Sequence, residues 1–245
     1  MKLIAKKIYW GLSTILFLPF IIADYRAFSR ADKAKRFTYS LRTAYPQILD
    51  KTELTGFDRH YVYHTTWAAR RVQELNPTLH TDIASSLYFP GIVSAFVPVA
   101  FYDYRPAPLH LSNLTTEHAD LTKLHFESDS IESLSCMHTI EHIGLGRYGD
   151  PIDPEADITA TKELARVLAP GGQLLFVTPV GKEAVIQFNA HRIYTYEQVL
   201  SLFPELTLKE FSYVPERGTE GIQENASPDS LKNESYACGL FVFSK

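Results

Sequence analysis

The chain has 245 residues, of which 45% are hydrophobic and 21% are charged, and its formal net charge is -4 at pH 7. This length fits one large domain with a short extension and leaves little room for two unrelated enzymatic domains. The slightly acidic balance excludes a general attraction for nucleic acid, so we expect no nucleic-acid partner. The only cysteines, Cys136 and Cys238, lie in apolar segments. This usage predicts buried thiols in a reducing, cytoplasmic environment rather than a disulfide framework.

An uncharged, apolar segment from Ile8 to Ala23 follows the basic N-terminus. It is slightly shorter than the roughly 20 residues that span a bilayer comfortably, although a tilted or locally thinned arrangement would accommodate it. Two interpretations stay open: a membrane anchor, and an amphipathic or packing helix on the domain or the membrane surface. No small-residue cleavage site follows, which disfavours a secretory signal. If the segment spans, the excess of basic residues after it keeps the main domain on the cytoplasmic face.

We therefore predict a hydrophobic helix with a basic flank over residues 1–36 and an α/β domain over residues 37–245. The first helix of the domain is predicted over residues 60–75, because Asn76-Pro77 ends it. Strands and helices then alternate, which predicts a mostly parallel sheet covered by helices on both faces. Strands are expected at residues 79–84, 97–104, 114–120, 133–140 and 173–180, a helix within residues 154–172 before Pro170-Gly171-Gly172, and a closing antiparallel pair at residues 206–214 and 235–245.

Suggestive side chains follow the first three predicted strands, and ligands of open α/β sheets bind at the carboxyl ends of strands. The first strand ends in Asp82-Ile83-Ala84-Ser85-Ser86, where small residues let a ligand approach the backbone and the amides can meet a carboxylate near a helix N-terminus. Asp103 ends the second strand about 20 residues later, the spacing of a carboxylate that accepts from ribose hydroxyls. Asp120 and Leu121 follow the third, where an acid can accept from an adenine amino group and leucine can cover the ring.

The segment after the fourth strand contains His138, Glu141 and His142 in the pattern H-x-x-E-H. A zinc hydrolase needs both histidines one turn apart on a stable helix, so that their nitrogens converge on one ion. Here a strand-like segment precedes the motif and three glycines follow almost at once, so any helix is about one turn long. No third ligand can be assigned from the sequence, so no metal is assigned and a metal-dependent hydrolase is the least favoured alternative.

In order and position these residues resemble the class I S-adenosylmethionine-dependent methyltransferases. The resemblance extends from about Phe57 to Lys245 and implies a Rossmann-like fold, a mostly parallel sheet with an antiparallel final strand. The first turn departs from the family's D-x-G-x-G, because Asp82-Ile83-Ala84-Ser85-Ser86 has no glycine. More narrowly, HTDIASS, HTIEHIGLGRYGDPIDP and FNAHRIYTYEQVL are similar to the family named domain of unknown function 268. The fourth strand end also resembles the E-x-x-E-H of ubiquinone-pathway O-methyltransferases, which can hold a divalent metal, although His138 replaces the first glutamate here.

The resemblance implies S-adenosylmethionine as cofactor, held by Asp82, Ala84, Ser85, Ser86, Asp103, Asp120 and Leu121. A histidine suits the deprotonation of a hydroxyl or amine acceptor at neutral pH. The catalytic candidates are His142 and His138, with Glu141 orienting an imidazole, followed by His191. A polar acceptor, such as a sugar or glycan precursor, is expected to contact Arg147, Tyr148, Asp150, Asn189 and Arg192. The main alternative is a methyltransferase-like fold without catalysis that acts as a binding or scaffold module.

Overall fold

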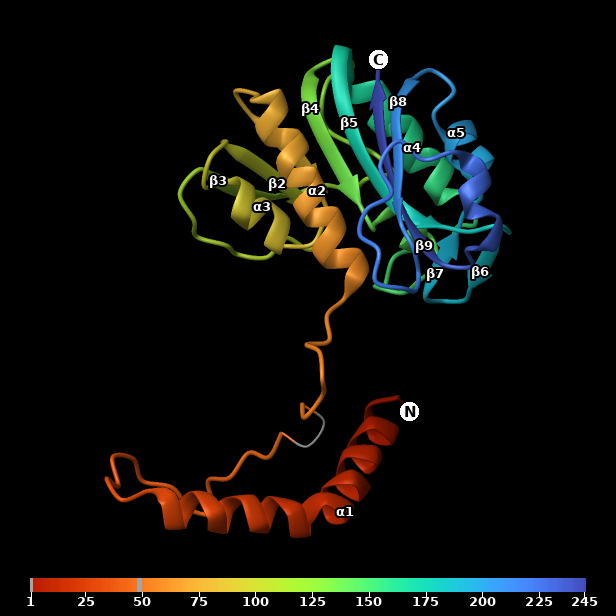
Figure 1. Cartoon of the computed structure of the whole chain (residues 1–245). Helices are drawn as coiled ribbons and strands as arrows, with labels where there is room; N and C mark the ends of the chain where they lie inside the picture. Colours follow the sequence, from red (N-terminus) through yellow and green to blue (C-terminus); the bar gives the residue numbers. More distant parts are fainter. Residues whose placement is uncertain (1, 48–49) are drawn as a thin grey trace. The chain divides into compact units, whose positions relative to one another are not determined.

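The computed structural model in Figure 1 describes the backbone of residues 2–47 and 50–245 and the side chains of residues 17–47 and 50–245. The chain forms two compact units, Met1–Phe57 and Asp58–Lys245. The predicted boundary after residue 36 falls inside the first unit, and Met1 lies outside the described residues.

The first unit contains the helix α1, Lys2–Ala31, and a segment without regular structure. Pro19 lies inside α1 and cannot donate the helical hydrogen bond of its own nitrogen. Among the described residues, no helix combines the length and the hydropathy that crossing a bilayer requires. Of the two interpretations of Ile8 to Ala23, this finding does not support the membrane anchor; the side chains of residues 8–16 lie outside those that the structure describes.

The second unit is built on a sheet of seven strands with the order β3-β2-β1-β4-β5-β9-β8. The first five strands of this order are parallel, and β9 pairs antiparallel with both β5 and β8. The predicted mixed sheet, including its antiparallel closing pair, is confirmed. The strands are β1 (His80–Ile83), β2 (Val99–Asp103), β3 (Leu114–His118), β4 (Ile131–Met137), β5 (Leu168–Val180), β8 (Thr207–Val214) and β9 (Ala237–Ser244).

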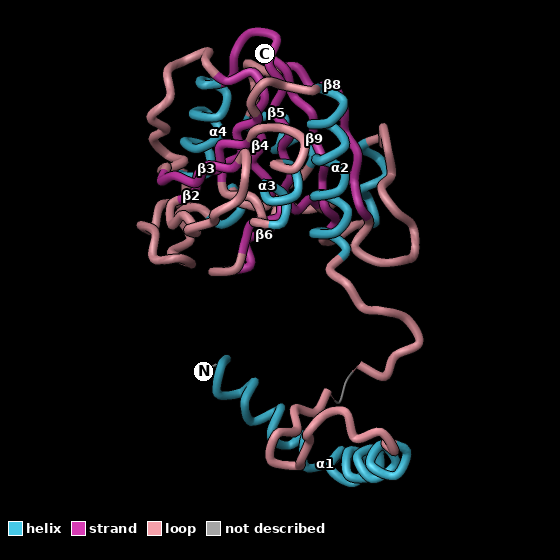
Figure 2. Tube along the Cα trace, turned by 90° about the vertical axis from the view of Figure 1, so that its left-hand side faces the viewer, coloured by secondary structure: helices cyan, strands magenta, loops and turns pink. Residues whose placement is uncertain are grey.

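Helices cover both faces of this sheet, because alternate residues of each buried strand point to opposite sides. Leu175 and Val177 of β5 join one apolar cluster with α2 (Arg59–Leu75) and α3 (Tyr88–Val93). Leu174 and Phe176 join the other, with α4 (Ala156–Val167) and α5 (Tyr196–Leu202). Figure 2 shows α2 and α4 on opposite sides of the strands. The domain is therefore a three-layered sandwich.

The predicted first helix matches α2 to within one residue, because capping residues define both of its ends. Asp58 accepts a hydrogen bond from the amide of Tyr61 at 3.1 Å, which satisfies one of the free amides at the helix start. Asn76 closes the helix in the left-handed conformation. The cap places His60 and His64 on the buried face of α2, one turn apart.

The structure differs from the prediction around Pro170-Gly171-Gly172, which lies within β5 rather than between helix and strand. A bulge takes up the extra residues, since Ile131 pairs with Leu168 and Ser133 with Gln173. The chain also forms a hairpin of β6 (Val185–Gln187) and β7 (His191–Ile193), which carries three of the predicted site residues. Two 3-10 helices, η1 (Ile140–His142) and η2 (Pro228–Asn233), lie elsewhere in the domain.

Candidate functional site

A cavity of about 570 Å³ lies at the carboxyl ends of the parallel strands. This volume lies within the roughly 300–1,000 Å³ of small-molecule sites. Register brings the strand ends together, because Ile83 pairs with Tyr102 and Asp103 with His118. The cavity is lined by eight of the sixteen predicted site residues, namely Ala84, Asp103, Asp120, Leu121, His138, His142, Tyr148 and Asp150.

Two carboxylates on neighbouring strand ends line one part of the cavity. Asp103 Oδ1 accepts from the amide of Arg105 at 2.7 Å, and Asp120 Oδ1 accepts from the amide and hydroxyl of Thr122 at 2.9 and 2.7 Å. These local bonds fix both side chains and use only Oδ1, so each Oδ2 can still accept from a ligand. Leu121 adds an apolar wall beside them.

The turn after β1 keeps a glycine-like backbone without a glycine. Ala84 has a φ of +58°, in the left-handed region that L-residues adopt at a cost. Two hydrogen bonds hold it there: its amide donates to Tyr102 O at 2.7 Å, and its carbonyl accepts from Thr139 Oγ at 2.9 Å. The following helix α3 has only six residues, so the helix N-terminus expected next to Ser85 and Ser86 is short, and neither serine lines the cavity.

Asp82 is a structural residue rather than the direct cofactor contact that the sequence predicted. Its side chain is fully buried and accepts hydrogen bonds from Ser135 and, at 2.6 Å, from Ser85. Ser85 in turn accepts from the amide of Met137 at 3.2 Å, and Ser135 also contacts His80 at 2.9 Å. This network joins β1 to β4 beneath the cavity. Burial raises the pKa of Asp82 to about 7.

The H-x-x-E-H segment does not form the helical zinc pair of a hydrolase. Only three of its residues, Ile140–His142, form the single turn η1, as its glycines predict. Glu141 lies between the imidazoles instead: its Oε1 is 2.8 Å from His138 Nδ1 and 3.7 Å from His142 Nε2. The predicted role of Glu141 in orienting an imidazole thus agrees with this geometry. Burial raises the pKa of Glu141 to about 7.

His142 is held by the backbone of the β6–β7 hairpin. Its Nδ1 lies 2.7 Å from the carbonyl of Ala190, which also accepts from Arg147 at 2.8 Å. Since a carbonyl needs a donor, Nδ1 carries the proton and Nε2 bears the lone pair. Nη1 of Arg147 lies 3.0 Å from Nδ1 and 3.5 Å from Nε2. Burial lowers the pKa of His142, which leaves the imidazole neutral at pH 7.

A second group of side chains surrounds His138 from the other side, and sequence reasoning missed it. His60 and His64 come from α2, and Cys238 comes from β9. The His60 and His64 rings lie 5.6 and 4.9 Å from that of His138, and Cys238 Sγ lies 3.4 Å from its Nε2. Burial lowers the pKa of both His60 and His138 to about 4. The spacing of His60 and His64 by four residues was the available signal, but it does not identify the partner strand.

Two of the five predicted substrate-binding residues line the cavity, and the other three do not. Tyr148 and Asp150 line the cavity, and Asp150 Oδ2 accepts from the amides of Gly144 and Gly146 at 2.8 and 3.3 Å, which orders the loop. Arg147 lies outside the lining, with its guanidinium 4.9 Å from the centre of the Tyr148 ring.

The prediction for Arg192 is wrong, because this residue is only 5% exposed, does not line the cavity and binds the chain itself through its side chain. It donates to the carbonyls of Ile143 and Pro154 at 2.6 and 3.2 Å. Asn189 is exposed on the β6–β7 turn and is not part of the cavity wall. His191 also stands off the wall, 6.3 Å from the His142 ring, with a buried Nε2 that has no hydrogen-bond partner among the described residues.

Comparisons with known proteins agree with this architecture. The family model described as "Caenorhabditis protein of unknown function, DUF268" matches residues 110–215. A comparison with curated protein sequences gives no significant match. Among solved structures, the N-methyltransferase NodS from Bradyrhizobium japonicum, in complex with S-adenosyl-L-homocysteine, is similar with a TM-score of 0.51. It is 15% identical, and the match covers 75% of this chain and 86% of NodS.

Two further structures extend this comparison. The 1,6-didemethyltoxoflavin-N1-methyltransferase from Burkholderia thailandensis, with bound S-adenosylhomocysteine, is 12% identical and has a TM-score of 0.52 over 74% of this chain and 78% of its own. The [4+2]-cyclase SpnF is 13% identical and has a TM-score of 0.51 over 74% and 80%. At these identities the likeness concerns the fold. The chain thus shares its fold with these two methyltransferases and this cyclase, and its residues 110–215 match the DUF268 model.

Proposed function

We propose that the protein transfers a methyl group from S-adenosylmethionine to a polar acceptor. The observation that carries this proposal is the single cavity that joins the strand-end carboxylates Asp103 and Asp120 to the imidazoles of His138 and His142. The first pair suits a nucleoside, and the second suits proton removal from an acceptor. Fold comparison supports the proposal without establishing it, since SpnF, described as a cyclase, has the same fold.

The residues around the cavity fit the cofactor. The free Oδ2 of Asp103 would accept from the ribose hydroxyls, and Asp120 with Leu121 would hold the adenine ring. Ala84, which has no more than a methyl side chain, lets the remaining part of the cofactor approach the first turn. When bound, S-adenosylmethionine supplies an electrophilic methyl group, so the protein mainly has to position the reactants and accept a proton.

His142 is the side chain best suited to accept that proton. The carbonyl of Ala190 fixes the Nδ1–H tautomer, so the Nε2 lone pair is available to a nucleophile in the cavity. Its pKa below the ordinary value keeps the ring unprotonated at neutral pH. Glu141, 3.7 Å from Nε2, would stabilise the imidazolium that forms after proton transfer.

The lining of the cavity supports a hydroxylated acceptor, such as a sugar or glycan precursor. Tyr148 offers an aromatic face, with the guanidinium of Arg105 4.9 Å from its ring centre. Asp150 and Asp153, from the same loop, add carboxylate acceptors to the wall. Such a mixture of an aromatic plane and fixed acceptors can orient a polyol through stacking and hydrogen bonds.

A second candidate function is a binding module without methyl transfer. The observation that favours it is the first turn, where Ala84 and Ser86 stand at the two glycine positions of the family pattern. Side chains at these positions reduce the space for a cofactor chain next to the backbone.

Calorimetry with S-adenosylhomocysteine and the full chain separates these functions. We expect micromolar binding by the parent protein and a roughly 10- to 100-fold loss in Asp103→Ala, because a hydrogen bond to a charged group contributes about 1.5–3 kcal/mol. Glu117→Ala is the matched control, since Glu117 is an exposed carboxylate on the adjacent β3 and does not line the cavity. No binding by the folded parent would overturn the methyltransferase proposal and favour the binding module.

A further inference from the structure

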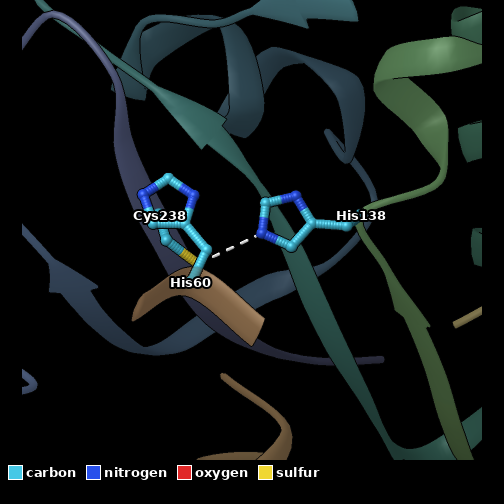
Figure 3. Close-up of side chains that lie close together, drawn as sticks. All are labelled: His60, His138 and Cys238. Atoms are coloured by element: carbon cyan, nitrogen blue, oxygen red, sulfur yellow. Dashed lines mark hydrogen bonds between the residues drawn. The ribbon is translucent and has the colours of Figure 1, made fainter. Parts of the chain in front are cut away.

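Three side chains able to ligate a metal meet where α2, β4 and β9 come together (Figure 3). The ligand atoms of His60, His138 and Cys238 all lie within 4.8 Å of one another, and all three residues are buried. Sγ of Cys238 is 3.4 Å from Nε2 of His138. Donors in a tetrahedral zinc site are about 3.3–3.6 Å apart, as bond lengths of about 2.0–2.3 Å require. The trio therefore needs only a small contraction around an ion.

We propose that His60, His138 and Cys238 bind a divalent transition-metal ion of the zinc type. Two imidazoles and one thiolate suit a borderline-soft cation and do not suit magnesium or calcium, which take oxygen ligands. Three protein ligands leave a fourth position for an exchangeable group, as in catalytic zinc sites. His138 also lines the cavity, so the ion would lie next to the space in which an acceptor is proposed to bind.

Glu141 orients one of the proposed ligands, His138. Its Oε1 lies 2.8 Å from Nδ1 of His138, so the Nδ1–H of the imidazole donates to the carboxylate and Nε2 keeps its lone pair. A carboxylate that orients a metal-binding histidine in this way is a recurrent feature of zinc sites. His138 is the first residue after β4 and has a φ of +53°, and the chain then enters η1, which carries Glu141.

The charge of the cluster is a second, independent argument for a cation. Glu141 is only 1% exposed, and its Oε2 has no hydrogen-bond partner among the described residues. A buried carboxylate without full compensation is costly. The charges of one dication, one carboxylate and one thiolate sum to zero, so metal binding would remove this cost.

The competing arrangement is a metal-free one, in which the thiol of Cys238 donates to Nε2 of His138 and the rings of Tyr61 and Tyr236 pack around the imidazoles. Both arrangements use the same residues, but only one binds an ion stoichiometrically. Metal content therefore decides between them.

The test is cobalt and zinc titration of the full chain, freed of any affinity tag and dialysed against a chelator. We expect one Zn²⁺ per chain by elemental analysis, and with Co²⁺ the sulfur-to-metal charge-transfer absorption that reports a thiolate ligand. Cys238→Ser and His60→Gln should weaken binding at least 100-fold, and Cys238→Ser should abolish the charge-transfer band. Glu141→Gln should weaken binding by about 10- to 100-fold and retain the band.

The control variants are Cys136→Ala, the other buried cysteine, and His110→Ala, an exposed histidine outside the cluster. Both should bind as the parent does, and circular dichroism checks that every variant is folded. Failure of the folded parent to bind either ion, or binding that survives both Cys238→Ser and His60→Gln, overturns the proposal. Neither readout uses methyl transfer or S-adenosylhomocysteine, so this result stands apart from the test of the proposed function.

Discussion

Replacing Ala84 by glycine should stabilise the protein, although most changes to glycine destabilise. Ala84 is held at a φ of +58°, where a residue with a Cβ is disfavoured by roughly 1–2 kcal/mol and glycine is not. The free energy of unfolding of the variant falls by about 0.4–1 kcal/mol because glycine gives the unfolded chain more conformational freedom. Loss of a half-buried methyl group removes a further few tenths of a kcal/mol. The expected net effect of Ala84→Gly is a gain of about 0.5 kcal/mol in the free energy of unfolding.

Urea unfolding of the parent and the variant measures this change. Both hydrogen bonds of Ala84 use backbone atoms, so the substitution leaves the turn intact and S-adenosylhomocysteine affinity should stay within a few fold. Ala165→Gly, inside α4, is the control and should lose about 1 kcal/mol. If Ala84→Gly loses as much stability as this control, the left-handed conformation is not a source of strain and the reasoning fails.

Two further predictions concern pH. Burial lowers the pKa of His80 to about 3, against about 6.5 unfolded, so the unfolded chain binds one more proton between these values and the protein loses stability as pH falls below 6.5. Between pH 6 and pH 4 the free energy of unfolding of the parent should therefore fall more steeply than that of His80→Gln, by about 1.4 kcal/mol per pH unit. Equal slopes for the two proteins would contradict this. For methyl transfer, the acid limb of kcat/KM should have an apparent pKa below 6.5, because burial lowers the pKa of His142. His142→Asn should reduce kcat at least 100-fold with cofactor affinity nearly unchanged; full activity would remove His142 from the mechanism.

The site residues that directly follow strands could be predicted from the sequence, because parallel strands bring such residues together at one edge of the sheet. The alternation of strands and helices predicts parallel strands, and parallel strands place their carboxyl ends along one edge of the sheet. Asp103 and Asp120 follow two such strand ends, and both line the cavity. The single turn of Ile140–His142 also follows from local glycines. These inferences need only neighbouring residues and one rule about sheets.

The remaining features depend on burial and on contacts between distant segments. Asp82 and Arg192 look functional in the sequence because they are charged and follow apolar segments. In the structure both are buried, Asp82 Oδ1 accepts from two serine hydroxyls, and the Arg192 guanidinium donates to backbone carbonyls. His60 and Cys238 look ordinary, since one lies on an amphipathic helix and the other in an apolar strand. Only the packing of α2 and β9 against the end of β4 makes them neighbours.

The assembly of the site from both ends of the second unit limits how the protein can be shortened. Residues 110–215, which the family model covers, contain His138, Glu141 and His142 but neither Asp103 nor Cys238. A fragment with these bounds would keep the histidine motif and lose the Asp103 carboxylate, the Cys238 thiol and the strand β9. A shortened form of this protein for biochemical work therefore needs to include α2 at one end and β9 at the other.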